Sequence, residues 1–472
     1  MLRRTLILLL ITLGLAAATW CAEKEEPLPK ELPPYGPLRA IEAPKTHGQK
    51  LPNGITVWLV PRLGFPKVAI AIAVHGGMAA DPKDLPGLSD LLLATIDQGT
   101  RTRSARKIAE DLQAAGGDLT GSSDSDALVL STAVLASKLD AALDVLADVI
   151  QNATFPDSEV DLAKRNAADA LRAQEAEPSF LARRALAKAL FGDHPYSVMA
   201  GTQESIAKTT ASDLRREYGR RFRPDQTLIV AVGDFDAARM LISIQNLVAK
   251  WTPPQEAAVA EATTPSGANP HAVFLVPRQG SVQTTFALGA LGPVEGDPAF
   301  AAAEVANAIY GGMFGSRLIK NIREDKGYTY SPGAFLRPRR ATGVLQTRAD
   351  VRNEVTGATL NEISYELNRM ATTAPAEDEL TRAQRFLVGV RAISLQAEAS
   401  VARQLASLWV RGLPPEELGQ LSDKILKATR EDAEAAGGKY FPFSHQTIVA
   451  VGDEKAIKQQ LAPFGLEVKP AP

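Results

Sequence analysis

The sequence predicts an α+β protein of two duplicated domains, each an antiparallel-rich sheet with packed helices. One observation behind this prediction is an internal repeat: the tetrapeptide Leu-Val-Pro-Arg at 59–62 recurs at 275–278. A second is that the segment 226–234, which ends in Val-Gly-Asp, is echoed at 446–453 at nearly the same offset. Two matches at opposite ends of each half indicate a duplication of about 200 residues.

The third observation is the order of elements within each half. Strand-like apolar runs at 68–74 and 284–291 follow the repeated tetrapeptides. Long amphipathic segments predict helices at 104–115, 137–151, 157–176 and 179–190, and at 299–310, 355–372, 377–393 and 400–411. Strands at the beginning, middle and end of each half favour an α+β arrangement over a doubly wound parallel sheet. No glycine-rich loop stands between a strand and a helix as nucleotide binding would require.

Composition restricts the class of protein further. The chain has 472 residues, 45% hydrophobic and 22% charged, which is typical of a folded, water-soluble protein. A formal net charge of -2 offers no general attraction to nucleic acid or anionic lipid. The single cysteine, Cys21, excludes an internal disulfide framework and a thiolate zinc cluster. Any metal ligand would have to be His, Asp or Glu.

The N-terminal residues predict export. Arg3 and Arg4 precede an apolar run at 6–18 that is too short to span a bilayer, so residues 1–22 read as a secretory signal peptide. We expect a periplasmic or secreted protein with no transmembrane segment in the mature chain. A lipid anchor on Cys21 is disfavoured because Trp20 occupies the place of the usual small residue.

Domain boundaries follow from composition. Residues 23–45 are rich in Pro, Glu and Lys and predict an extended linker. The first domain is expected at 46–252, a second linker at 253–270 and the second domain at 271–472.

A helix that carries a degenerate metal motif is expected in the segment 84–100. Pro86 suits its start and Gly99 its end, so Asp90, Leu93 and Ala94 share one face. The segment resembles the signature of the pitrilysin/insulinase superfamily, which includes the mitochondrial processing peptidases and carries the zinc motif H-x-x-E-H on this helix. His194-Pro195-Tyr196 and Gly201-Thr202 resemble a second block of the superfamily, and the similarity covers roughly residues 46 to 465. The resemblance implies two domains that form half of a clamshell.

The resemblance also implies that the zinc chemistry is lost. The two zinc histidines align with Asp90 and Ala94, the catalytic glutamate with Leu93, and the distal glutamate ligand falls at or near Ala163. Zinc needs nitrogen, sulfur or oxygen donors, and hydrolysis needs a base for the bound water. We therefore expect no metal and no cofactor in this chain. Asp90 is either a solvated helix residue or a residual supporting group.

The second half resembles the part of the superfamily's active site that holds the substrate. In the superfamily an Arg and a Tyr seven positions apart hold the substrate, and Arg323 and Tyr330 match this spacing. We expect Arg323 to end a helix, Gly327 to permit a turn and Tyr330 to enter the next strand, with Tyr328 as a rival on the same strand face. The alternative is an arginine that caps helix carbonyls beside a half-buried tyrosine.

A glycine-rich run precedes this pair. Gly311, Gly312 and Gly315 could leave backbone amides open to an extended peptide. Zinc-free partners in the processing peptidases use a glycine-rich loop for substrate, so the resemblance implies a substrate loop here. A loop without any ligand is the alternative.

Other candidates are weaker. No two of the five histidines lie four residues apart, and His75 is expected in a turn before Gly76 and Gly77. No G-x-S-x-G elbow is present. The acidic stretch 118–126 lacks the spacing of a calcium loop and predicts a solvated strand or turn.

These observations predict a non-catalytic, substrate-positioning subunit of a heterodimeric zinc metallopeptidase that cleaves peptides in an enclosed chamber. A homologous subunit with H-x-x-E-H would hold the zinc. A zinc-free peptide-binding or scaffold protein on the same fold is the alternative, and an autonomous hydrolase with a rebuilt metal site is disfavoured by Leu93. Peptide specificity and the choice between homodimer and heterodimer stay open.

Overall fold

The computed structural model describes residue 36 and residues 41–266 and 272–472. Residues Ile41–Pro472 form one compact unit that holds both predicted halves. The predicted signal peptide with Cys21 lies outside the described residues, as do most of the predicted linker at 23–45 and the end of the linker at 253–270. The domain boundaries stay predictions.

The first half contains a six-stranded sheet in the order β1-β2-β6-β3-β5-β4. Its neighbouring strands are antiparallel except β2 and β6, which are parallel. The strands are β1 (His47–Lys50), β2 (Thr56–Pro61), β3 (Lys67–His75), β4 (Thr120–Ser123), β5 (Ala127–Leu135) and β6 (Thr227–Gly233).

The second half contains a six-stranded sheet in the order β12-β7-β11-β8-β10-β9. The strands are β7 (Ala272–Pro277), β8 (Gln283–Gly292), β9 (Gly333–Pro338), β10 (Gly343–Arg352), β11 (Thr447–Gly452) and β12 (Glu467–Pro470). Five strands in each sheet follow the same order, and β7 lies parallel to β11 as β2 lies parallel to β6. The predicted duplication and fold class are thereby confirmed.

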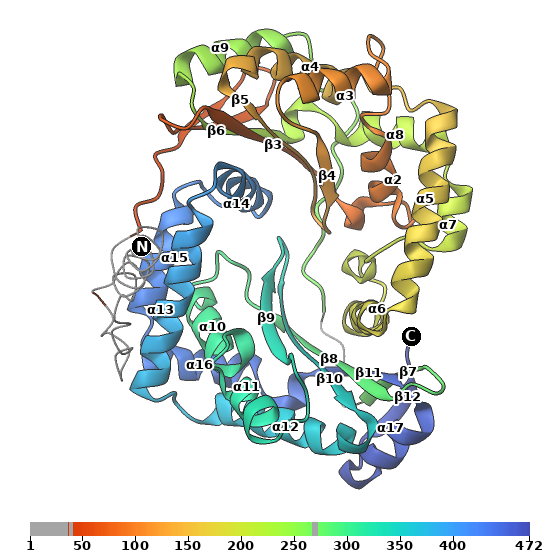
Figure 1. The fold of residues 1–472 in the computed structure, drawn as a ribbon, viewed down its shortest axis with the longest axis vertical. Coiled ribbons are helices and arrows are strands. Elements are labelled where there is room, and N and C mark those ends of the chain that lie inside the picture. The colour runs from red at the N-terminus through yellow and green to blue at the C-terminus, as the bar shows by residue number, and fades with distance from the viewer. Residues whose placement is uncertain (1–35, 37–40, 267–271) are drawn as a thin grey trace, which may run out of the picture. The chain divides into compact units, whose positions relative to one another are not determined.

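Helices cover these sheets in both halves (Figure 1). The first half has α2 (Leu88–Thr95), α3 (Ala105–Ala114), α4 (Leu139–Asn152), α5 (Asp157–Ala176), α6 (Pro178–Phe191), α7 (Gln203–Lys208), α8 (Ala211–Arg221) and α9 (Ala237–Val248). The second has α10 (Phe300–Asn307), α11 (Arg317–Ile319), α12 (Thr356–Thr372), α13 (Glu377–Ser394), α14 (Glu398–Val410), α15 (Glu417–Lys427), α16 (Arg430–Tyr440) and α17 (Glu454–Leu461). Two π-helical segments, η5 (Ala308–Gly312) and η6 (Lys320–Asp325), extend α10 and α11. The eight helices expected from periodicity are confirmed, with small shifts at their ends.

The two halves exchange one helix each. The apolar side of α14, from the second half, packs on the face of β3, β5 and β6 in the first sheet. In return α6 packs on β8 and β11 of the second sheet, where Ala182 and Leu186 meet Ala287 and Val449 (Figure 1). The opposite face of each sheet is buried under helices of its own half. Burial of apolar surface in these contacts stabilises both halves together.

None of the helices in the described part of the chain is long and apolar enough to cross a membrane.

Candidate functional site

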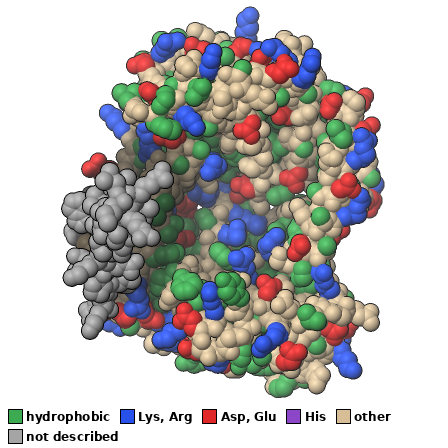
Figure 2. All heavy atoms as spheres, in the orientation of Figure 1, with side chains coloured by type: hydrophobic (Ala, Val, Ile, Leu, Met, Phe, Trp, Pro, Cys, Tyr) green, Lys and Arg blue, Asp and Glu red, His purple; other side chains and the backbone are tan. Residues whose placement is uncertain are grey.

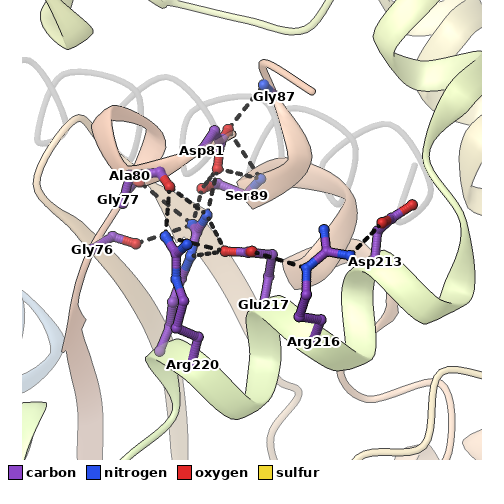
Figure 3. Close-up of polar contacts among 11 residues, drawn as sticks. Gly76, Gly77, Ala80, Asp81, Gly87, Ser89, Asp213, Arg216, Glu217 and Arg220 are labelled. Atoms are coloured by element: carbon purple, nitrogen blue, oxygen red, sulfur yellow. Dashed lines mark hydrogen bonds and ion pairs between the residues drawn. The ribbon is translucent and has the colours of Figure 1, made fainter. Parts of the chain in front are cut away.

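The helix that carries the degenerate metal motif, α2, is fixed at its start by a buried cluster of charges (Figure 3). Asp81 accepts hydrogen bonds from the amide of Gly87 at 2.9 Å and from the hydroxyl of Ser89 at 2.6 Å. Arg221, in α8, is fully buried and pairs with Asp81 at 2.9 Å and with Glu217 at 3.2 Å. Because buried charges are tolerated only when paired and hydrogen-bonded, this cluster locks the start of α2 against α8.

Two glycines bring the two resembling blocks together. Gly87 has φ 83° and lies so close to Gly201 that a Cβ on Gly87 would come within 2.4 Å of the Gly201 backbone. Ser205 donates a hydrogen bond to the carbonyl of Pro86 at 2.8 Å. Only glycine fits at such a contact with a left-handed backbone. The Pro-Gly-Leu and Gly-Thr segments, more than 100 residues apart in sequence, are therefore neighbours.

A pocket of about 320 Å³ lies beside α2, lined by Asp90, Leu93 and Ala94 and by residues of β4. The hydroxyl of Ser123, in β4, donates a hydrogen bond to the Asp90 carboxylate. Burial raises the pKa of Asp90 above its usual range, although its own side chain remains open to solvent. The expectation that the helix runs to Gly99 is wrong, because α2 ends at Thr95 and residues 96–98 turn away.

The residues of this pocket do not suit a zinc ion. Leu93 and Ala94 have no donor atoms, and Ala163, in α5, is half-buried against the core. In the part of the chain that the structure describes, no group of three or more His, Cys, Asp or Glu side chains could hold a metal ion. The two carboxylates that line this pocket, Asp90 and Asp97, cannot by themselves complete the four-coordinate shell that zinc prefers.

Arg323 and Tyr330, the pair that the resemblance implies, lie together. The guanidinium carbon of Arg323 is 4.6 Å from the centre of the Tyr330 ring and 4.9 Å from the centre of the Phe314 ring. Both rings face solvent, with Tyr330 80% and Phe314 64% exposed. The Arg323 side chain forms no ion pair and no hydrogen bond within the described residues. We call Phe314, Arg323 and Tyr330 the arginine clamp.

The backbone around the clamp explains how it forms. Arg323 belongs to η6, and its carbonyl accepts a hydrogen bond from the amide of Gly327 at 3.1 Å. Gly327 has φ 62°, so the chain reverses direction there, as the sequence predicts. The expectation that Tyr328 and Tyr330 share a strand face is wrong. Strand β9 begins at Gly333, because the Tyr328 amide bonds to the Ile322 carbonyl and keeps this segment on the helix end.

An ion pair attaches the clamp helix to the body of the second half. Arg317, in α11, donates two hydrogen bonds of 2.7 Å to the carboxylate of Glu379 in α13. These bonds lower the pKa of Glu379 to about 2. A bidentate pair with one buried partner is strong and directional, so it fixes the helix from which Arg323 extends.

The three glycines of the predicted substrate loop differ in surroundings. Gly311 is buried against Ala334, and a Cβ on it would come within 2.8 Å of the Ala334 side chain. Gly312 packs closely on Asn307, whereas Gly315 is exposed with open space around it. Close packing explains the first two glycines, and only Gly315, next to Phe314, faces solvent. A substrate role for the loop stays a prediction.

Two features of the sequence that were considered for metal binding, His75 and the acidic stretch 118–126, contact residues of the second half. His75, expected in a turn, is the last residue of β3, and its ring stacks on Trp409 of α14 at 4.0 Å. Burial, with the nearby charge of Arg340, lowers the pKa of His75 to about 4. In the acidic stretch 118–126, β4 forms as expected, and Asp126 accepts a hydrogen bond of 2.9 Å from the amide of Arg340 in the second half. Both groups serve packing rather than metal binding.

Comparison with known families decides the identity of the fold. A family model described as insulinase, peptidase family M16, matches residues 63–200, and one described as the peptidase M16 inactive domain matches residues 208–387. The chain belongs to peptidase family M16. The predicted superfamily is thereby confirmed.

M16 relatives are similar over most of the chain. A Bacillus subtilis (strain 168) protein, the uncharacterised zinc protease YmxG, is 28% identical over 295 residues, which are 62% of this chain and 70% of the relative. An uncharacterised zinc protease of Rickettsia felis is 24% identical over 388 residues, which are 80% of this chain and 91% of the relative.

Solved structures share the fold. The peptidase M16 inactive domain from Pseudomonas fluorescens superposes with a TM-score of 0.81 at 24% identity, covering 91% of this chain and all of that one. A protease from Helicobacter pylori gives a TM-score of 0.79 at 16% identity, covering 87% of this chain and all of that one. At these identities the likeness concerns the fold alone.

Sequence reasoning missed the charge cluster around Arg221. Its partners are separated in sequence by 140 positions, from Asp81 to Arg221, and neither residue stands in a recognisable motif. The i, i+4 spacing of Glu217 and Arg221 was the one local signal, and it is equally common on exposed helices.

Proposed function

We propose that this M16 chain is the non-catalytic, substrate-positioning subunit of a heterodimeric zinc metallopeptidase. The observation that carries the proposal is the unpaired guanidinium of Arg323 between two exposed aromatic rings. An arginine needed only for stability would be expected to pair with a carboxylate, as Arg317 does with Glu379.

The arginine clamp can bind a peptide backbone. Rings that contact the guanidinium restrain it while leaving N–H groups free to donate to a carbonyl. The exposed rings of Phe314 and Tyr330 offer apolar surface to the peptide's side chains. A restrained cationic donor also stabilises negative charge that develops on a carbonyl oxygen, so the clamp suits both binding and turnover.

Hydrolysis on this chain alone is not supported. Leu93 stands where a general base is needed, and Ala94 cannot hold a metal ion. We therefore assign the zinc, its water and the base to a homologous partner subunit that carries H-x-x-E-H. Export to the periplasm or beyond, inferred from residues 1–22, belongs to the same proposal.

The alternative is a zinc-free peptide-binding or scaffold protein. It shares the arginine clamp but requires no catalytic partner. Whether an H-x-x-E-H homologue assembles with the chain distinguishes the two functions.

The test is purification of the tagged chain from its native cell envelope, followed by peptide hydrolysis assays. We expect an H-x-x-E-H homologue to co-purify, with chelator-sensitive hydrolysis by the mixture and none by this chain alone. Peptide binding without such a partner would favour the alternative, and chelator-sensitive hydrolysis by the pure chain would overturn both.

A further inference from the structure

A second pocket, separate from α2 and from the arginine clamp, lies between α6 of the first half and strands β9 and β10 of the second. It has a volume of about 290 Å³, and three arginines line it: Arg183 from α6, and Arg337 and Arg339 from the end of β9 and the turn that follows. Lys and Arg side chains gather where the surface is hollowed between β9 and α6 (Figure 2). We call this the arginine pocket.

The positive charge of the arginine pocket is only partly compensated by nearby carboxylates. None of its three arginines forms an ion pair within the described residues. Burial, together with the charges of Arg183 and Arg348, lowers the pKa of Arg337 below its usual range. Asp126 and Asp124 act on Arg339, whose guanidinium also donates a hydrogen bond to the carbonyl of Tyr196 at 3.2 Å. The uncompensated charge of the pocket therefore belongs to Arg183 and Arg337. Burial of arginines that repel one another is unfavourable, and an anionic ligand would relieve that repulsion.

Two of the three guanidinium groups of the pocket, those of Arg337 and Arg339, lie over aromatic rings. Arg337 and Arg348 both lie over the ring of Phe335, at 5.4 and 4.9 Å from its centre. Arg339 lies over Phe191 and Tyr196 at 5.0 and 4.8 Å. Such contacts restrain the arginines without using their hydrogen-bond donors, so little ordering is needed when a ligand binds.

An unpartnered polar side chain also lines the pocket. Gln346 is only 8% exposed, yet its side chain makes no hydrogen bond in the part of the chain that the structure describes. In the β9–β10 register Gln346 pairs with Phe335 and Val344 pairs with Arg337, so the four residues share the sheet face that α6 covers. The amide atoms of Gln346 are not fully enclosed, so they are open to the pocket and can pair with a ligand there.

We infer that the arginine pocket binds a carboxylate of the peptide substrate, with the fork of Arg337 and Arg183 as its main donors. Arginine recognises carboxylates through two parallel hydrogen bonds, which fits this group better than a single lysine would. The apolar side chains of Leu190, Phe191 and Met199 complete the wall and suit the hydrocarbon stem that carries the carboxylate.

The inference rests on the proposed function, because it assigns specificity to a peptide held by the arginine clamp. Strand β9 begins three residues after Tyr330 and leads to Arg337, so the clamp and the pocket lie toward opposite ends of one strand. From Gly333 to Arg337 the strand advances roughly 13 Å, a length that about four or five residues of an extended peptide cover.

The test compares peptides that differ only in the carboxylate. Three fluorescent, N-acetylated peptides of one sequence are titrated with the purified full chain: internal Glu with an amidated C-terminus, internal Gln with an amidated C-terminus, and internal Gln with a free C-terminus. We expect one of the two carboxylate peptides to bind about tenfold more tightly than the neutral peptide, and the stronger one identifies a side-chain or a C-terminal carboxylate as the ligand.

The variants Arg337→Gln and Arg183→Gln should each reduce that preference severalfold. The matched control is Arg184→Gln, the neighbouring arginine on α6, which pairs with Glu175 and does not line the pocket. Equal binding of all three peptides to the wild-type chain would overturn the arginine pocket while leaving the proposed function intact. Failure to bind any of a wide set of peptides would overturn both.

Discussion

The guanidinium of Arg323 and the ring of Tyr330, seven positions apart in sequence, are stacked at 4.6 Å on a surface where the ring is 80% exposed. The stack exists because Gly327 reverses the chain between them. No carboxylate competes for the arginine among the described residues, so the pair is available to a ligand. This relationship leads to the first prediction.

Replacing Arg323 should impair the assembled peptidase without dissociating it. We expect Arg323→Ala to lower turnover about 100-fold, the usual size of the loss when one donor to a developing oxyanion is removed. Arg323→Lys should recover little, because an ammonium lacks the planar fork that stacks between two rings. Steady-state kinetics and gel filtration of the complex check both variants. A third variant, Tyr330→Phe, should keep the ring beside Arg323 but lose the contribution of the phenol hydroxyl to turnover.

The control for these variants is Arg382→Ala, because Arg382 is an exposed arginine of α13 that pairs with Asp378. Unchanged turnover in Arg323→Ala, with the complex intact, would remove the assigned role of the clamp.

The second prediction concerns metal content. Elemental analysis of the purified chain should find less than about 0.1 zinc per chain, because its motif helix offers Asp90 alone as a ligand. Restoring two imidazoles with Asp90→His and Ala94→His should create measurable zinc affinity, since residues at i and i+4 on one helix face can chelate. Stoichiometric zinc in the unaltered chain would contradict the assignment of the metal to a partner.

The third prediction tests the buried charges that position α2. Arg221→Ala should reduce the free energy of unfolding by about 3–5 kcal/mol, because Asp81 would remain buried without a cation and Glu217 would keep only its longer ion pairs with Arg216 and Arg220. Arg216→Ala, on the same helix, removes an exposed side chain that pairs with Asp213 at 2.8 Å and with Glu217 at 3.6 Å, and should cost less than about 1 kcal/mol. Denaturant unfolding measures the free energy of unfolding of both variants. Equal losses of stability would show that the burial of the ion pairs does not determine how much stability they contribute.

The fourth prediction is a pH dependence of stability. The pKa of His75 is lowered from 6.5 to about 4 by burial and by Arg340, so the folded chain favours the neutral ring that stacks on Trp409. Between pH 6.5 and 4 the unfolded chain therefore binds more protons than the folded chain, and stability falls as the pH falls. After allowance for solvent screening we expect a loss of about 1–2 kcal/mol across this range.

The variant His75→Phe keeps a ring on Trp409 but cannot titrate. Urea unfolding at several pH values should show a shallower decline for this variant than for the unaltered chain. Identical slopes would mean that other groups cause the acid sensitivity.

Local patterns account for what could be predicted of the fold. Helices such as α5, expected at 157–176 and observed at Asp157–Ala176, depend on an apolar periodicity that neighbouring residues carry. The repeated strands were recognisable because each half contains the same two apolar runs. In the first half these runs are β2 and β6, and in the second half they are β7 and β11, each pair forming neighbouring parallel strands. Element ends were less certain, as the end of α2 at Thr95 and the start of β9 at Gly333 show, because they depend on single hydrogen bonds.

By itself the sequence determined the α+β class and the duplication, which follow from periodicity and from the repeat. The family and the pairing of Arg323 with Tyr330 followed from the resemblance of its motifs to a known superfamily. Only the tertiary structure decided which groups from distant segments meet: Arg221 with Asp81, His75 with Trp409, and Arg183 with Arg337. The exchange of α6 and α14 between the sheets makes the last two of these contacts. The burial of a side chain and the charges around it depend on which distant segments the fold brings near. The local sequence pattern does not contain that information.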